Sequence, residues 1–372
     1  MTHKMGICYD DIFMQHDTGP GNIYFRLENL LEPETFIESR LRACQMKKIM
    51  QASGIMAELI AIPFGSASLE QLGYVHRLEY IRYIRETCQQ GGGDAGNGTT
   101  PMDSTSFEVA SRGAGAALAA VDAVMDGDVS SVYCLVRPPG HHALPDFGMG
   151  FCIFNNGALA ATHALKQHAL CRVMIIDWDS HHGNGTQAIF WKSPQVLTVS
   201  LHQDGMYPQD SGRIEEAGEG DGLGYNVNIP LPAGTGNEGY RYAFERVIEP
   251  LADWYRPELV IAASGQDASI FDPLARLSLT MAGFRMLGEK TAQIARRYAN
   301  GRLVLTQEGG YNTTYGPFCC AATIEAVAGL EHQLADPFEM DQVPAQRLTR
   351  EQIEVVETVA LVARRNLGLA SL

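Results

Sequence analysis

The amino-acid sequence predicts an α/β fold in which a mainly parallel β-sheet is flanked by helices. Short apolar runs rich in β-branched residues, such as 173–176, are typical of strands buried on both faces. These runs alternate with longer stretches of helical pattern, which indicates β–α–β units. The chain has 372 residues, 45% of them hydrophobic, and no linker divides it. We therefore expect a single domain over residues 1–372, with its core at about 5–330 and a C-terminal helical tail at about 331–372.

The elements become regular after a mixed N-terminal part, residues 1–75, in which one helix is expected at about 36–53. The glycine-rich segment 89–98 predicts a mobile loop. Thr280 can cap a helix that Asn300 and Gly301 end, and Pro257 follows another helix. Apolar runs predict strands at 131–136, 172–176, 196–201, 225–229, 259–263 and 303–306. Helices are expected at about 105–125, 156–168, 238–255, 281–299 and 316–329.

Composition restricts the partners and the compartment. The formal net charge of −15 argues against nucleic acid and anionic membranes as general partners. No apolar run approaches the ~20 residues of a membrane helix, and the N-terminus lacks the apolar core of a secretion signal. The eight cysteines show no CxxC spacing, and several lie in apolar runs, so we expect reduced thiols and a cytoplasmic protein. The composition leaves the oligomeric state open, a homo-oligomer included.

Polar residues that can carry chemistry follow four of the predicted strands. The segments are Arg-Pro-Pro-Gly-His-His at 137–142, Asp-Trp-Asp-Ser-His-His at 177–182, Ser-Gly-Gln-Asp at 264–267 and Gln-Glu-Gly-Gly-Tyr at 307–311. In a parallel sheet these segments emerge at one edge, where open α/β sheets bind ligands. The strands were assigned from apolar pattern alone, so the polar residues at their ends are an independent indication of one site.

A divalent metal site can be assembled from these strand ends. Asp179 and His181 are two residues apart, so in extended chain they project to the same side. Together with Asp267 they provide three protein ligands and leave one position open, as in catalytic zinc sites. Taken alone, Asp267 is as often a helix cap as a ligand. Their joint placement favours a metal that acidifies a water molecule and polarises a carbonyl group.

The remaining polar residues suit hydrolysis of an amide or ester. His141 and His142 can act as general acid and base, and Asp177 and Asn184 can orient them. Tyr311 follows two glycines and can reach a developing oxyanion, although a lone tyrosine is more often a core residue. His202 ends another strand and is expected to be structural. The remaining histidines are expected to be surface or packing residues: His16, His76, His163, His168 and His332.

Several motifs resemble those of the zinc-dependent histone deacetylases, in particular the class II branch and its bacterial histone-deacetylase-like amidohydrolases. The motifs are RPPGHH at 137–142, GFCIFNN at 150–156, DWDSHHGNGTQ at 177–187, SLH at 200–202 and EGGY at 308–311. The resemblance runs from Tyr9 and Asp10 to about residue 330. It implies the arginase/deacetylase fold, a single α/β domain with an eight-stranded mainly parallel sheet. It also implies an acyl-lysine peptide or a small acyl-amine as the substrate.

The resemblance implies a role for each matching residue. Zinc, one ion per chain, would be bound by Asp179, His181 and Asp267. His141 and His142 would be the acid/base pair, Asp177 would support His141, and Tyr311 would bind the carbonyl oxygen. Phe151 would line a narrow channel, and the Gly150 carbonyl would accept from the substrate N–H. One potassium site would use Asp177, Ser200 and main-chain oxygens of Asp179, His181 and Leu201; a second would use main-chain oxygens near Phe190, Ser193, Val196 and Tyr225.

Three positions depart from the commonest family pattern. Asn184 stands where class I members have aspartate, so we expect His142 to be a neutral and weaker base. Tyr207 takes the place of the second channel phenylalanine and makes that wall more polar. Gln266 precedes the expected zinc ligand where close relatives tend to have an apolar residue, and it is expected near the substrate.

Other functions remain open from the sequence. If the protein is a hydrolase, its substrate can be acetyl-lysine, an acetylated polyamine or a small amide. Iron(II) can replace zinc as its metal. A non-catalytic acyl-lysine-binding module would not need Tyr311 and both histidines. A ureohydrolase of the same fold would need carboxylate-rich strand ends for two metal ions, which fits the sequence poorly. No GxSxG motif supports a serine hydrolase.

Overall fold

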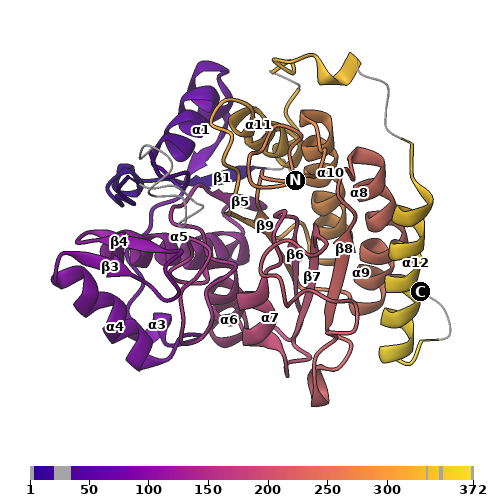
Figure 1. The fold of residues 1–372 in the computed structure, drawn as a ribbon, viewed down its shortest axis with the longest axis horizontal. Coiled ribbons are helices and arrows are strands. Elements are labelled where there is room, and N and C mark those ends of the chain that lie inside the picture. The colour runs from indigo at the N-terminus through magenta and orange to yellow at the C-terminus, as the bar shows by residue number, and fades with distance from the viewer. Residues whose placement is uncertain (1–3, 21–34, 332–333, 343–346, 370–372) are drawn as a thin grey trace, which may run out of the picture.

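An eight-stranded sheet forms the centre of the structure, a computed structural model that describes residues 4–20, 35–331, 334–342 and 347–369. The strand order is β2-β1-β5-β10-β9-β6-β7-β8, and each neighbouring pair is parallel (Figure 1). The predicted α/β class and single domain are confirmed. The strands are β1 (Met5–Cys8), β2 (Ile60–Ala61), β5 (Ser131–Cys134), β6 (Val173–Asp177), β7 (Val196–Gln203), β8 (Asn226–Leu231), β9 (Leu259–Ser264) and β10 (Leu303–Gln307).

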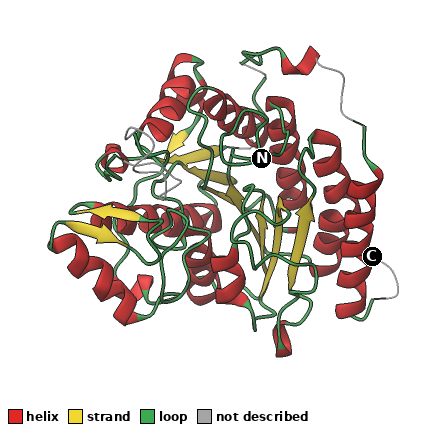
Figure 2. Cartoon of the chain, viewed as in Figure 1, coloured by secondary structure: helices red, strands yellow, loops and turns green. Residues whose placement is uncertain are grey.

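Helices cover both faces of the sheet, which explains why the strands are apolar throughout (Figure 2). Val173 and Ile175 of β6 pack in a cluster with α5 (Ser106–Asp126) and α6 (Asn156–Gln167). Met174 and Ile176, which point the opposite way, pack in the cluster on the other face. The helices on that face are α1 (Leu41–Ala52), α8 (Asn237–Ala243), α9 (Glu249–Tyr255), α10 (Met281–Tyr298), α11 (Tyr315–Ala328) and α12 (Arg350–Asn366).

Most expected helices have the predicted limits. The helix expected at about 238–255 is continuous, with a π-helical turn, Phe244–Ile248, joining α8 to α9. The helix expected at about 36–53 begins only at Leu41. No helix in the described part of the chain is long and apolar enough to span a bilayer.

The C-terminal segment, expected to be a helical tail, contains α12, which packs on the core. Its side chains Val356, Val359, Ala360 and Ala363 are buried in the main cluster. The reason is that α12 packs along the edge strand β8, whose outer side would otherwise lack a cover.

The glycine-rich segment 89–98 is ordered, contrary to the expected mobile loop. The end of α4 (Leu78–Gln89) leads into a small antiparallel hairpin, β3 (Gly92–Asp94) and β4 (Pro101–Asp103). The Asp94 carboxylate accepts hydrogen bonds from the backbone N–H groups of Gly96, Gly98 and Thr100. An aspartate that binds its own turn in this way supplies the order that the glycines alone do not.

Candidate active site

The four strand-end segments meet because their strands are neighbours. β5, β10, β9 and β6 lie side by side in the sheet, so the loops that leave their carboxyl ends share one edge. These loops bring together the predicted ligands, the histidine pair and Tyr311, all of which are buried. Sequence positions 130 residues apart are thereby in contact, as the Gly309 N–H shows by donating to Asp179 Oδ2 over 2.7 Å.

Asp179, His181 and Asp267 form a tight cluster whose ligand atoms all lie within 4.8 Å of one another. His181 Nδ1 is 3.1 Å from Asp179 Oδ1 and 2.9 Å from Asp267 Oδ2. The outer carboxylate oxygens are held by backbone donors, since Ser180 N–H donates to Asp267 Oδ1 over 2.7 Å and Gly309 N–H donates to Asp179 Oδ2. Asp267 therefore points toward the pair formed by Asp179 and His181.

The donor set of this cluster fits a zinc ion. Burial and the neighbouring Asp179 charge raise the pKa of Asp267 to about 6, as expected for two carboxylates that share a buried site. A divalent cation would compensate both charges, and one imidazole with two carboxylates is a ligand combination that zinc accepts. Three protein ligands also leave a coordination position for water or substrate.

The tandem histidines stand beside this cluster, each held by a different partner. His141 Nδ1 is 2.9 Å from Asp177 Oδ2, and its Nε2 is 3.7 Å from Asp179 Oδ1. His142 Nδ1 is 2.7 Å from Asn184 Oδ1. Since the amide oxygen can only accept, this hydrogen-bond pattern assigns the proton of His142 to Nδ1 and leaves a lone pair on Nε2. The partners expected from the sequence are thus in place.

The two imidazoles have opposite proton affinities. Burial lowers the pKa of His141, but the carboxylates of Asp179 and Asp177 outweigh it and raise the value to about 10. Burial and the positive charges of His141 and His181 hold the pKa of His142 well below its ordinary value. A pair of groups whose environments separate their pKa values in this way is suited to acid and base roles.

Aromatic side chains line the approach to the cluster. The rings of Phe151 and Tyr311 meet edge to face with centroids 5.5 Å apart, and Phe36 packs edge-on against Phe151 at 5.4 Å. Tyr207 stands at right angles to His142, with ring centroids 5.1 Å apart. Its buried hydroxyl is without a hydrogen-bond partner in the described part of the chain. Tyr207 is therefore beside His142, Phe151 is beside Tyr311, and the substrate channel that these residues are expected to line remains a prediction.

The ordered segment after β3 supports this wall. The hydroxyl oxygen of Thr99 accepts from the Gly150 N–H over 2.9 Å, and that of Thr100 accepts from the Phe151 N–H over 3.1 Å. Phe151 has φ of 69°, which is unfavourable for a residue with a side chain. We infer that these two hydrogen bonds help to hold Phe151 in this conformation. No sequence pattern indicated either hydrogen bond.

The expectation that Gln266 lies near the substrate is not supported by its surroundings. The side chain is fully buried, and its amide nitrogen donates to the Ser264 carbonyl over 2.9 Å. Its amide oxygen accepts from the Gln307 side chain over 2.7 Å, and Gln307 in turn accepts from the Tyr133 hydroxyl. Gln266, two residues after β9, therefore directs its side chain into this buried polar network.

The residues expected at potassium sites remain a prediction. Asp177 Oδ1 accepts from the Asp179 N–H over 3.0 Å, and Ser200 Oγ is 2.9 Å from His202 Nδ1. His202 is thus buried and bonded at both ring nitrogens, the second to the Gly212 carbonyl, as expected of a structural residue. Near the second expected site, Ser193 N–H donates to the Phe190 carbonyl over 2.9 Å.

Glu308 is a supporting residue whose role was missed, although it lies in a recognised motif. One carboxylate oxygen accepts from the backbone N–H groups of Gly140 and His141, at 2.7 and 3.1 Å. The other accepts from the Thr306 hydroxyl over 3.0 Å. Burial raises the pKa of Glu308 to about 7. Through these hydrogen bonds, Glu308 anchors the loop that carries the two histidines.

A buried ion network behind Tyr311 was also missed. Glu38 lies between two arginines, 2.9 Å from Arg137 Nε and 2.7 Å from Arg42 NH1. Arg42 donates to the Gly310 carbonyl over 2.6 Å and lies over the Tyr311 ring, 4.6 Å from its centroid. Glu38 and Arg42 have the i, i+4 spacing of an ion pair within the expected helix, but spacing gives no indication of their contacts with Arg137 and Tyr311.

Comparisons with known proteins agree with the geometry. A histone deacetylase domain model matches residues 36–327. The chain is 39% identical to a histone deacetylase-like amidohydrolase of Pseudomonas aeruginosa, covering 91% of this chain and 89% of that one. It is 36% identical to a probable deacetylase of Archaeoglobus fulgidus, with coverage of 88% and 87%. The HD domain of HDA15 superposes with a TM-score of 0.86 at 28% identity, over 98% of this chain and 95% of that one. The chain therefore belongs to the histone deacetylase family and is an amide-bond hydrolase.

Proposed function

We propose that the protein is a zinc-dependent deacylase that removes acetyl or related acyl groups from lysine side chains or similar amines. The observation that carries the proposal is the convergence of Asp179, His181 and Asp267 beside two histidines that are oriented by Asp177 and Asn184. Zinc, held by those three residues, would polarise the substrate carbonyl and activate a water molecule.

The residues around the cluster then divide the proton transfers. His142 presents the Nε2 lone pair and acts as general base, receiving the proton of the attacking water. His141, backed by the Asp177 carboxylate, is protonated and gives its proton to the leaving amine. Burial keeps the Tyr311 phenol neutral by raising its pKa, so it can donate a hydrogen bond to the developing oxyanion.

The walls of the channel suit a slender acyl-amine. The Phe151 ring covers one side, and the Gly150 carbonyl is proposed to accept from the amide N–H of the substrate. Tyr207 covers the opposite side next to His142.

A substrate screen tests the proposal directly. Zinc-loaded protein is assayed against an acetyl-lysine peptide, a trifluoroacetyl-lysine peptide and an acetylated polyamine, with and without a hydroxamate. We expect turnover of the lysine peptides and its loss on addition of the hydroxamate, which binds an open metal position. Failure of the zinc-loaded, folded protein to hydrolyse any of the three would refute the proposed function.

We further propose two structural potassium ions, one at Asp177, Ser200 and Leu201 and one near Phe190, Ser193, Val196 and Tyr225. Replacing potassium by choline in the buffer should lower the midpoint of thermal unfolding, and an unchanged midpoint would contradict this. We also propose a reducing compartment such as the cytoplasm, because all eight cysteines are free. A disulfide in protein purified without reductant would argue against it.

A further inference from the structure

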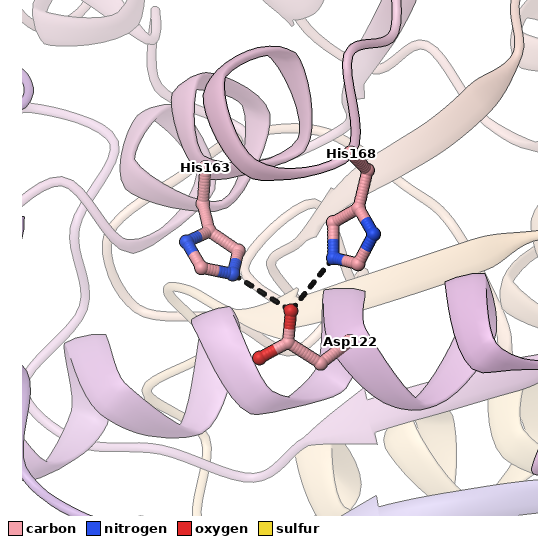
Figure 3. Close-up of side chains that lie close together, drawn as sticks. All are labelled: Asp122, His163 and His168. Carbon is pink, nitrogen blue, oxygen red and sulfur yellow. Dashed lines mark hydrogen bonds and ion pairs between the residues drawn. The ribbon is translucent and has the colours of Figure 1, made fainter.

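A second group of metal-binding side chains lies on the helices, away from the strand ends (Figure 3). Asp122 belongs to α5, His163 belongs to α6, and His168 is the first residue after α6. His163 Nε2 is 2.8 Å from Asp122 Oδ1, and His168 Nε2 is 2.7 Å from the same oxygen. Two imidazoles from one helix end thus converge on one carboxylate oxygen of the neighbouring helix.

The group is partly open to solvent, unlike the strand-end cluster. The side chain of His163 is 7% exposed, that of His168 is 19% exposed, and that of Asp122 is 47% exposed. The three residues face an open surface pocket. Its other lining residues are Ser68, Glu70, Gln71, Tyr74 and Gln167. An ion bound here would keep room for water ligands on the pocket side.

The ring nitrogens can present their lone pairs to such an ion. His163 Nδ1 is buried and without a hydrogen-bond partner in the described part of the chain. Because a carboxylate only accepts, the Nε2 of each ring donates its proton to Asp122 Oδ1 in the absence of an ion, and an ion bound at Nε2 would move that proton to Nδ1 of the same ring. The ring of Tyr74 stacks on His163 with centroids 6.3 Å apart, which fixes the plane of the imidazole.

The ligand types narrow the choice of ion. Two imidazole nitrogens and one carboxylate oxygen suit zinc, copper or nickel, whereas calcium and magnesium prefer oxygen ligands. Zinc–nitrogen and zinc–oxygen bonds of about 2.0–2.2 Å would require the three side chains to part slightly from their present hydrogen-bond distances. The exposed carboxylate and the helix-terminal His168 are the parts that can move.

We propose that Asp122, His163 and His168 form a second divalent-metal site, separate from the catalytic centre, that binds zinc or copper with water completing the coordination. The ion would join α5 to the C-terminal end of α6. The N-cap of α6 precedes His163 by eight residues, which is about 12 Å along the helix at 1.5 Å per residue. There Asn155, its N-cap, donates to the main chain of the loop that holds the tandem histidines.

Copper(II) spectroscopy tests the site without relying on enzyme activity. Wild-type protein loaded with one zinc ion per chain is titrated with copper(II), and bound copper is followed by electron paramagnetic resonance. We expect one additional copper per chain with hyperfine coupling to two imidazole nitrogens. The strand-end cluster offers one imidazole among its three ligands, so the two signals are distinguishable.

Matched variants assign the signal to these residues. His168→Asn should reduce the coupling to one nitrogen, and Asp122→Asn should weaken copper binding at least about tenfold. Glu70→Gln, in the same pocket but outside the group, should leave both unchanged. Circular dichroism and retained deacylase turnover report whether the variants are folded. Absence of the additional copper in wild-type protein, or its persistence with two nitrogens in folded His168→Asn, would overturn the proposal.

Discussion

The two histidine–carboxylate groups differ in how the fold holds them. At the strand ends, two carboxylates and one imidazole are fully buried, and backbone N–H groups of Ser180 and Gly309 fix the outer oxygens of Asp267 and Asp179. On the helices, one carboxylate and two imidazoles contact one another, and Asp122 is about half exposed. The strand-end carboxylates are therefore held by backbone groups, whereas Asp122 is held by the two imidazole side chains.

The same carboxylate-to-amide change in each group gives the sharpest contrast. Asp267→Asn should lower kcat/KM at least ~10³-fold, because a catalytic metal contributes several kcal/mol and each ~1.4 kcal/mol is a factor of ten. Asp122→Asn should leave kcat/KM within about twofold, as for most surface changes. Steady-state kinetics on an acetyl-lysine peptide measure both. Equal losses in the two variants would show that the helical group belongs to the catalytic machinery.

Tyr311 tests a residue beside the strand-end cluster that is proposed to act in catalysis without binding the metal. Tyr311→Phe should lower kcat about 10²–10³-fold, since it removes one donor to the oxyanion. Zinc content and KM should change little, because the ring contacts to Phe151 and Arg42 are kept. Metal analysis and full kinetics separate these quantities. If kcat stays at the wild-type value, the phenol is not the oxyanion donor.

Asn184→Asp tests whether the partner of His142 sets its basicity. A carboxylate 2.7 Å from Nδ1 should raise the low pKa of His142, because it favours the imidazolium. The base must be neutral to act, so the acidic limb of the kcat/KM profile should move to higher pH. At a pH below that limb, activity should fall about tenfold for each unit of the move. A histidine titration and a pH–rate profile without an upward shift would contradict the assignment.

The strand-end site was accessible to sequence analysis because its residues occupy a position fixed by topology. The length and composition of the apolar runs predicted β5, β6, β9 and β10. The carboxyl ends of parallel strands must share one edge of the sheet. The sequence alone therefore predicts that Asp179, His181 and Asp267 belong to one site. The strand order, which makes these strands neighbours, came only from the structure.

Residues that act through side-chain contacts between helices or irregular segments were not accessible. Asp122 and His163 lie on different helices, and their contact depends on how those helices are rotated against each other, which no short motif encodes. Glu38 likewise meets Arg137 across 99 positions. For the segment 89–98, glycine content suggested mobility, but the order comes from hydrogen bonds to the Asp94 carboxylate. Glycine content indicates that a backbone can be flexible, but it does not show whether a nearby side chain will fix that backbone by hydrogen bonds.

The smallest expected effect concerns the stability of the helical group itself. Burial acts to raise the pKa of Asp122, but hydrogen bonds from His163 and His168 outweigh it, so the pKa is lowered overall. A carboxyl group with a lowered pKa stabilises the fold fully above its ordinary pKa of 3.8, and this contribution is lost as the pH falls below 3.8 and through the lowered pKa of the folded state. Because Asp122 is about half exposed, solvent screening should limit the contribution to less than about 1 kcal/mol.

Urea unfolding of metal-free wild type and Asp122→Asn measures this contribution, which should be visible at neutral pH and vanish in acid. Added zinc should stabilise both proteins through the strand-end cluster, and the wild type further through the helical group, which separates the two proteins further. A difference of several kcal/mol without metal would mean that the helical group is as rigidly integrated as the strand-end cluster. The contrast between a fixed catalytic site and a loosely held helical one would then fail.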